Sequence, residues 1–287
     1  MVKKFVYGTP FETEAVVKEI PSSEENPDYG TFSTENGFSF TTKLADDDMV
    51  FGLGEANRGI NKRGFLYISD CADDPNHVES KTSLYAAHNF IIISGKTHVG
   101  FFFDYPGTLR FDIGYTTSDT MTVSCENADL YVYMITGDSD LDIVKQFRGI
   151  IGRSYIAPKF AFGYGQSRWG YKTEDDFRTV VKKYRENHVP LDMVYMDIDY
   201  MQDYKDFTVN EERFPDFEGF VQDMKKEKIH LVPIIDAGVK VEEGYDIYEE
   251  GCEKGYFCRR EDGSYFEATV WPGWTHFPDV LLSLIHI

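Results

Sequence analysis

The sequence lacks the patterns that signal a metal site, a membrane span or a secretory leader. Its four cysteines show no C-x-x-C spacing, and no histidine pair stands at the spacing of metal ligands. No apolar run approaches the roughly 18 residues that a membrane-spanning helix needs. The first five residues are followed by Tyr-Gly-Thr-Pro rather than by an apolar segment, so no signal peptide is expected. We therefore expect a cytoplasmic protein with free thiols and with neither a metal nor another cofactor.

Basic residues are also scarce. The chain has 29 Lys and Arg residues against 49 Asp and Glu residues, which gives a net charge of −20. A field of this sign repels phosphate backbones and anionic lipid surfaces. Nucleic acids and membranes are therefore not expected as partners, whereas a small neutral molecule is compatible with the charge.

The chain contains enough apolar residues to form a buried core. Its 287 residues, 42% of them hydrophobic, suffice for one large or two ordinary domains. Aromatic residues reach 16%. Such a content serves either core packing or stacking on sugar rings, and composition alone favours core packing.

Up to about residue 136 the pattern is that of β-structure. Short apolar segments are separated by Gly, Asp, Asn or Ser, and residues 90–93 and 99–103 around Ser94-Gly95-Lys96 predict a hairpin. Further strands are predicted over residues 109–113, 121–124 and 130–135. The spacing is typical of an antiparallel β-sandwich over residues 1–136. A helix over residues 138–148, within a linker covering 137–157, is expected to join it to the next domain.

After Pro158 strands and helices alternate. Strands are predicted over residues 160–165, 191–196 and 229–235, and helices begin after Thr173 and at about Asp216. Thr173 and Asp176 stand at capping-box spacing. Apolar strands alternating with helices imply a parallel sheet covered on both faces. The three strands predict an incomplete (β/α)₈ barrel over residues 158–279, with an excursion at about 241–269.

Two carboxylates follow the predicted parallel strands. Asp197 and Asp236 each end an apolar run, so both point to the sheet edge where α/β folds bind ligands. For one such Asp, capping a loop or pairing with an arginine would be the preferred interpretation; two on successive strands favour a site. Ile234 shares the strand parity of Asp236 and would line the same pocket. Asp199 is expected to orient the loop that follows.

Two tryptophans lie on predicted loops near that edge. Trp271 is followed by Pro-Gly, which argues against the centre of a buried strand, and Trp169 follows the first predicted strand. An aromatic platform beside carboxylate acceptors suits a sugar ring. Asp73 belongs to an Asp-Asp-Pro segment in the sandwich, for which an ordinary solvated turn is favoured from the residues alone.

Several motifs in order resemble the α-glucosidases of glycoside hydrolase family 31, and most of all bacterial enzymes of the gut-commensal clostridial type. The resemblance runs from about Phe5 to Asp279, and the matching segments are Phe51-Gly-Leu-Gly-Glu55, Gly165-Gln-Ser-Arg-Trp-Gly-Tyr171, Met196-Asp-Ile-Asp-Tyr-Met201, Pro233-Ile-Ile-Asp236, Val270-Trp-Pro-Gly273 and Phe277-Pro-Asp279. It implies a galactose-mutarotase-like N-terminal β-sandwich, a TIM barrel and retaining hydrolysis of terminal, non-reducing α-glucosidic bonds. Other enzymes of the family, such as an α-xylosidase, and a non-catalytic carbohydrate-binding protein are the alternatives.

The resemblance also implies roles for individual residues. Asp197 would bind hydroxyls of the −1 glucose, Ile198 and Ile234 would line its pocket, Asp236 would form the floor and Trp271 would pack against the sugar. Two further residues would lie outside this subsite: Trp169 near the +1 sugar and Asp73 on a loop over the entrance. The substrate would be a small neutral α-glucoside.

The family segments that supply the nucleophile and the acid/base have no counterpart in these 287 residues. Retaining hydrolysis needs two carboxylates about 5–5.5 Å apart. We therefore expect no catalytic residue in this chain, with both lying beyond residue 287, and a catalytically incomplete fragment. Residues 280–287 match nothing in the family pattern and are expected to be an artefactual tail.

Overall fold

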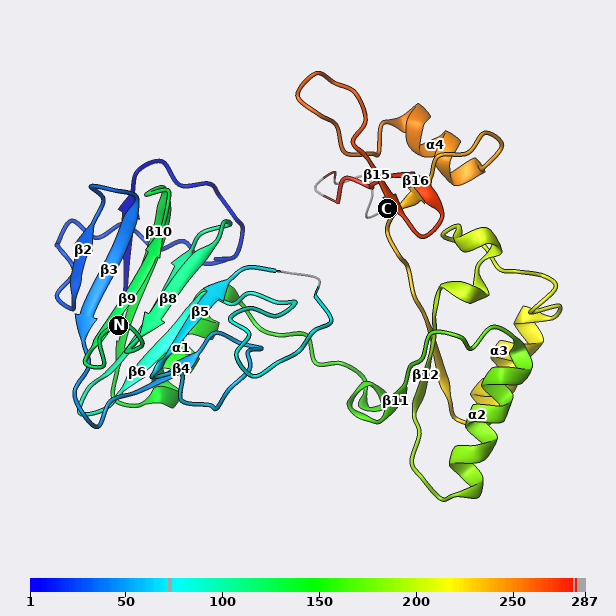
Figure 1. The fold of residues 1–287 in the computed structure, drawn as a ribbon, viewed down its shortest axis with the longest axis horizontal. Helices are drawn as coiled ribbons and strands as arrows, with labels where there is room; N and C mark the ends of the chain where they lie inside the picture. Colours follow the sequence, from blue (N-terminus) through cyan, green and yellow to red (C-terminus); the bar gives the residue numbers. More distant parts are fainter. Residues whose placement is uncertain (72–73, 281, 283–287) are drawn as a thin grey trace. The chain divides into compact units, whose positions relative to one another are not determined.

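The computed structural model describes residues 1–71, 74–280 and 282. Their contacts divide the chain into two compact units, Met1–Ser154 and Tyr155–Ile287, and both are drawn in Figure 1. Within the described residues, none of the helices combines the length and the apolar character needed to cross a bilayer.

The first unit contains two antiparallel five-stranded sheets, as the sequence predicted. One sheet has the order β1 (Val2–Tyr7), β10 (Leu130–Gly137), β7 (His98–Asp104), β6 (Phe90–Ser94) and β4 (Met49–Gly52). The other has the order β2 (Thr31–Ser33), β3 (Phe38–Lys43), β9 (Thr120–Cys125), β8 (Leu109–Ile113) and β5 (Phe65–Ser69). The predicted hairpin is β6–β7, with Ile93 opposite Val99.

The high aromatic content serves the core of this unit. Alternate residues of β3 and β7 point inward, because successive side chains of a strand lie on opposite faces. Five phenylalanines are fully buried there: Phe38, Phe40, Phe101, Phe103 and Phe111. Core packing, the interpretation that composition favoured, therefore accounts for much of the aromatic content.

Helix α1 (Asp140–Ile151) belongs to the first unit rather than spanning a linker. Its N-cap Ser139 accepts a hydrogen bond from the Asp142 N–H at 3.2 Å. Ile143 and Ile150 are buried among side chains of β6, β7 and β10, and the Phe147 ring stacks on Phe90 with centroids 3.8 Å apart. The apolar stripe of the helix thus covers the first sheet, and the unit ends only at Ser154.

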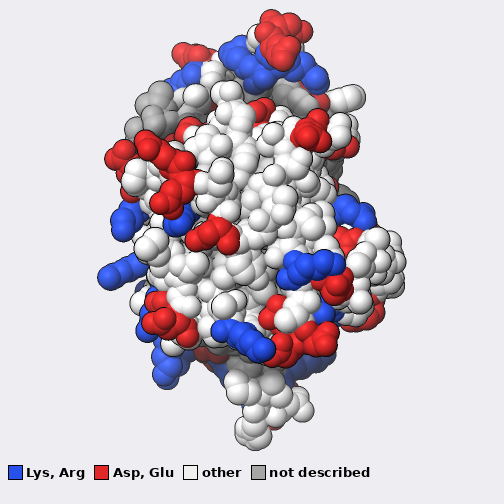
Figure 2. Space-filling view, turned by 90° about the vertical axis from the view of Figure 1, so that its left-hand side faces the viewer, with Lys and Arg blue, Asp and Glu red and all other residues white. Residues whose placement is uncertain are grey.

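The charge excess is not concentrated on the face shown in Figure 2. There, acidic and basic side chains are interspersed around a broad uncharged area.

The second unit begins with a three-stranded parallel sheet. Its order is β11 (Gly165–Gln166), β12 (Met193–Met196) and β13 (His230–Pro233), with α2 (Glu174–Glu186) and α3 (Phe217–Lys226) as the connecting helices. Phe177 of α2 and Phe220 of α3 belong to one buried cluster with Val194 and Met196 of the central strand. This is the strand-helix alternation predicted from the sequence.

Both helices start where the sequence predicted, and α2 has the predicted capping box. The Thr173 hydroxyl accepts the Asp176 N–H, and the Asp176 carboxylate accepts the Thr173 N–H, which completes a capping box at the start of α2. Asp216 caps α3 by accepting the Gly219 N–H at 2.9 Å.

The first predicted parallel strand was wrong over most of its length. Residues Lys159–Phe162 form a 3₁₀ turn that begins after Pro158, and only Gly165–Gln166 pairs with β12. The Phe160 ring stacks on His230 of β13 at 3.6 Å. An apolar run of this length cannot distinguish a strand from a turn that presents its rings to a neighbour.

The predicted excursion forms a small sheet of its own. Strands β14 (Val239–Lys240), β16 (Gly273–His276) and β15 (Glu267–Val270) pair antiparallel in that order, and α4 (Asp246–Lys254) lies between β14 and β15 in sequence. Val239, Tyr245 and Phe257 form its buried centre. Of the expected tail, residues 280–287, the structure describes Val280 and Leu282 only.

Candidate functional site

Asp197 directly follows the central parallel strand, as predicted. Its carboxylate accepts the N–H of Ile198 at 2.8 Å and starts the 3₁₀ turn Ile198–Tyr200. The side chain stays partly exposed, whereas Ile198 is buried. Asp197 therefore caps the turn and still reaches solvent, so its two proposed roles do not exclude each other.

Asp199 lies in the opposite environment. Its side chain is 1% exposed, and Oδ1 lies 3.6 Å from Nη1 of Arg213. The same Nη1 donates to the backbone oxygen of Asp199 at 2.8 Å. Arg213 thus ties the loop after β12 through the Asp199 backbone, while within the described residues neither oxygen of the buried Asp199 carboxylate has a hydrogen-bond partner.

The second strand end differs from the prediction. β13 ends at Pro233, so Asp236 lies three residues beyond the strand, and Ile234 and Ile235 are 40% and 59% exposed rather than buried. Among the described strands β13 is at the edge of the sheet, so one of its sides is not covered by a further strand. The Ile234 N–H still donates to the Met196 oxygen at 2.9 Å. This bond places Ile234 beside Met196, the last residue of β12, directly before Asp197.

Trp271 lies on the turn of the β15–β16 hairpin and is 69% exposed. Gly273 closes this turn with φ of 108°, a backbone conformation that disfavours other residues. The turn end of the hairpin approaches the chain just beyond Asp236, because a Cβ atom on Gly238 would lie 2.6 Å from Cγ2 of Val270. The indole is thus free to meet a ligand, as expected of a loop tryptophan.

Trp169 also presents its ring to solvent, with 65% of the residue exposed. It follows β11, whose carboxyl end lies at the same edge as that of β12 because the two strands are parallel. Gln166 at the end of β11 accepts a hydrogen bond from the Tyr184 hydroxyl at 2.5 Å, which ties this edge to α2. No described contact joins Trp169 to Asp197 or to Asp236.

Asp206 is a site residue that sequence reasoning missed. It is 1% exposed, and its Oδ1 accepts the backbone N–H of Asp236 at 3.2 Å. Burial, with a smaller contribution from the charge of Asp236, raises the pKa of Asp206 to about 6. Asp206 stands in an irregular segment without strand or helix periodicity, so no pattern marked it for burial.

The sandwich-domain residue Asp73 lies outside the described residues. Its neighbour Asp74 pairs with Lys81 at 3.0 Å. The N–H of Asn76, with Lys81, lowers the pKa of Asp74. At the described end of this loop, the Asp74 carboxylate is therefore ionised and bound to Lys81.

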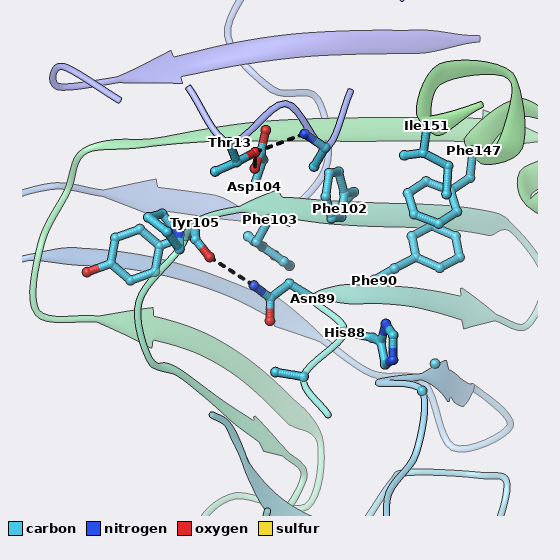
Figure 3. Close-up of a pocket in the computed structure, with 15 residues that line it drawn as sticks. Thr13, His88, Asn89, Phe90, Phe102, Phe103, Asp104, Tyr105, Phe147 and Ile151 are labelled. Carbon is cyan, nitrogen blue, oxygen red and sulfur yellow. Dashed lines mark hydrogen bonds between the residues drawn. The ribbon is translucent and has the colours of Figure 1, made fainter. Parts of the chain in front are cut away.

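A separate cavity of about 650 Å³ lies within the first unit, and none of the predicted site residues lines it. Figure 3 shows the stacked rings of Phe90 and Phe147 on one side and Asp104 on the other. The Thr13 hydroxyl donates to Asp104 at 2.5 Å. Burial raises the pKa of the Asp104 carboxyl. Among the described residues, no group of three or more His, Cys, Asp or Glu side chains is placed to hold a metal ion.

Comparison with known proteins identifies both units. Residues 9–112 match the N-terminal galactose mutarotase-like domain of glycosyl hydrolase 31, and residues 154–284 match the TIM-barrel domain of glycosyl hydrolases family 31. Alpha-glucosidase 2 of Bacillus thermoamyloliquefaciens is 36% identical over 242 residues, which cover 83% of this chain and 30% of that protein. An alpha-glucosidase of Saccharolobus solfataricus is 27% identical over 283 residues, which cover 97% of this chain and 40% of that protein.

Solved structures support the same fold. A family 31 dextranase of Flavobacterium johnsoniae in complex with isomaltotriose matches with a TM-score of 0.78 and 23% identity, over 88% of this chain and 31% of that one. The chain thus spans less than half the length of each of these proteins.

Proposed function

Because this chain belongs to glycoside hydrolase family 31, we propose that the protein that carries it is a retaining α-glucosidase acting on terminal, non-reducing α-glucosidic bonds. The observation that supports this most is the hydrogen bond from Ile234 to Met196, which places the chain after β13 beside the carboxyl end of β12, where Asp197 and Ile198 follow. Carboxylates accept hydrogen bonds from sugar hydroxyls, and apolar side chains contact the C–H faces of the ring. The substrate is a small neutral α-glucoside.

In this proposal each residue of the edge has one role. Asp197 binds hydroxyls of the −1 glucose, Ile198 and Ile234 line the subsite, and Asp236 forms its floor. Trp271 packs against the sugar with an indole that is 69% exposed. Outside this subsite, Trp169 lies near the +1 sugar.

The test uses the protein translated from the uninterrupted gene. We expect it to release p-nitrophenol from p-nitrophenyl α-glucoside faster than from the α-xyloside. Asp197→Ala should lower kcat/KM by about 10- to 100-fold, the cost of losing hydrogen bonds to a charged group. Glu211→Ala, an exposed carboxylate in the same unit, is the matched control. Faster turnover of the xyloside would indicate an α-xylosidase, and sugar binding without turnover of either substrate would indicate a binding protein; both results would overturn the proposal.

The 287-residue chain by itself should show no turnover. Retaining hydrolysis needs a nucleophile and an acid/base about 5–5.5 Å apart, and the family resemblance assigns neither role to Asp197 or Asp236. Purified chain incubated with p-nitrophenyl α-glucoside should therefore release no product above buffer. Turnover that disappears in Asp197→Ala would mean that the roles are misassigned.

A further inference from the structure

Residues 234–236 follow β13 and are held in place mainly by hydrogen bonds to β12 and to the loop after it. β13 ends at Pro233, and the last backbone bond that follows the sheet is the one from Ile234 to Met196. Beyond it, two side chains from the loop after β12 bond to the backbone. The Tyr200 hydroxyl donates to the Ile234 oxygen at 2.9 Å, and Asp206 Oδ1 accepts the Asp236 N–H at 3.2 Å.

Both supporting side chains are buried. Tyr200 is 6% exposed and Asp206 is 1% exposed. Within the described residues, Oδ2 of Asp206 has no hydrogen-bond partner. Burying a carboxyl group with only one hydrogen bond is energetically unfavourable, since an apolar side chain would occupy the same volume without a desolvation penalty. Its presence here is therefore better explained by the peptide group that it holds than by packing.

The backbone around Asp206 is strained as well. Asp203, Tyr204 and Phe207 have φ values of 51°, 59° and 61°, in the left-handed region that non-glycine residues rarely adopt. Contacts on both sides of the loop maintain this conformation. The Tyr245 hydroxyl donates to the Asp206 oxygen at 2.6 Å, and the Lys205 ammonium bonds to Glu242 at 2.7 Å.

We propose that Tyr200 and Asp206 are positioning residues that together fix the backbone of Ile234–Asp236, so that Ile234 and Asp236 keep the orientation in which they contact the sugar. Both act on peptide groups, so neither touches the substrate. The loop after β12 thereby couples its own sugar-binding residue, Asp197, to those that follow β13. The proposal rests on the proposed sugar contacts of Ile234 and Asp236.

The first test measures the hydrogen bonds directly, by amide hydrogen exchange of residues 234–236 in the 287-residue chain. Asp206→Ala removes the acceptor, and the Asp236 amide should exchange about 10-fold faster, as expected for the loss of a hydrogen bond to a charged group. Asp206→Asn keeps an acceptor oxygen and should restore most of the protection. Glu211→Ala, an exposed carboxylate, should change nothing. Unchanged exchange of Asp236 in Asp206→Ala would overturn the proposal.

Tyr200→Phe gives a second measurement if Asp206→Ala does not fold. It deletes one oxygen, and exchange in the peptide covering residues 234–236 should again accelerate several-fold. Tyr204→Phe, in the same loop, is its matched control. Equal exchange in the two phenylalanine variants would contradict the role of Tyr200.

The second test measures glucose affinity of the same variants by NMR titration. Asp206→Ala should weaken glucose binding at least 5-fold relative to wild type, with Asp206→Asn close to wild type. Faster exchange with equal glucose affinity in all variants would overturn the positioning role. If wild-type chain binds no glucose while the exchange differences persist, the proposed sugar contacts fail and the backbone support stands.

Discussion

Asp197 and Asp199 are two positions apart and yet differ in what they can do. Asp197 is partly exposed and accepts the N–H of the next residue, whereas Asp199 is buried against Arg213. Asp197 is the N-cap of the 3₁₀ turn after β12, and Asp199 lies inside that turn, where it is buried. One carboxylate is left for a ligand, and the other supports the loop that presents it.

At this residue scale, Asp206 makes stability depend on pH. Burial raises its pKa to about 6 from an ordinary value of 3.8, so the native state disfavours the charged carboxylate. The contribution of Asp206 should therefore lower the free energy of unfolding above pH 6. The free energy of unfolding should increase as the pH falls through 6 toward 3.8. Asp236, whose charge contributes, and the hydroxyls of Tyr200 and Tyr245 are the titratable groups that interact with it.

The measurement compares Asp206→Asn with wild type in urea at two pH values. The variant should gain roughly 2–3 kcal/mol relative to wild type on going from about pH 4 to about pH 7.5, because it carries no charge to bury. Circular dichroism at 222 nm follows the helices, of which α2, α3 and α4 belong to the second unit and α1 to the first. Glu211→Gln, which removes an exposed charge, should show the same change in the free energy of unfolding between the two pH values as wild type. An equal change in the free energy of unfolding for Asp206→Asn and wild type would contradict the prediction.

Trp169 should influence which linkage the intact enzyme prefers. Its exposed indole follows β11 on the rim where the leaving sugar would lie. Trp169→Tyr reduces the stacking surface and places a hydroxyl there, so the ratio of kcat/KM for isomaltose and maltose should change by an amount equivalent to about 1–3 kcal/mol. A residue that only packs locally would lower both activities equally. An unchanged ratio would therefore refute a role in linkage preference.

At the scale of the element, the capping box of α2 should contribute measurably to the second unit. The Thr173 hydroxyl and the Asp176 carboxylate bond to each other's backbone N–H at the helix start. Thr173→Ala should lower the free energy of unfolding by about 1 kcal/mol in urea denaturation. Thr179→Ala, the same substitution on the exposed middle of α2, should have no cost because alanine favours the helix interior. Equal losses in the two variants would exclude a specific effect of the cap.

At the scale of the whole molecule, the first unit should fold without the second. Every member of its two hydrophobic clusters lies before residue 155, and α1 packs on the first sheet within the same unit. Residues 1–154 expressed alone should therefore unfold cooperatively and should not bind the dye ANS. Strong ANS binding, or a broad transition without a baseline, would show that this core is incomplete.

The sequence by itself determined the sandwich strands β6 to β10, the cap of α2, the start of α3, the parallel pairing of β12 with β13, and the place of Asp197 at the end of β12. These follow from local signals: apolar alternation, a capping residue at fixed spacing, and a buried run bounded by Pro190 and Asp197. Each of these signals is contained within a few residues, so no knowledge of distant neighbours is needed.

Only the tertiary structure decided how far the strands extend and what supports the site. The runs over residues 160–165 and 229–235 are apolar, but Phe160 stacks on His230 in a turn, and Ile234 lies exposed past a strand at the edge of the sheet. The burial of Asp206 depends on a backbone N–H 30 residues away in the chain. An apolar run shows that a segment can be buried. Whether it is buried depends on the distant segment that packs beside it, and a local sequence pattern does not contain that segment.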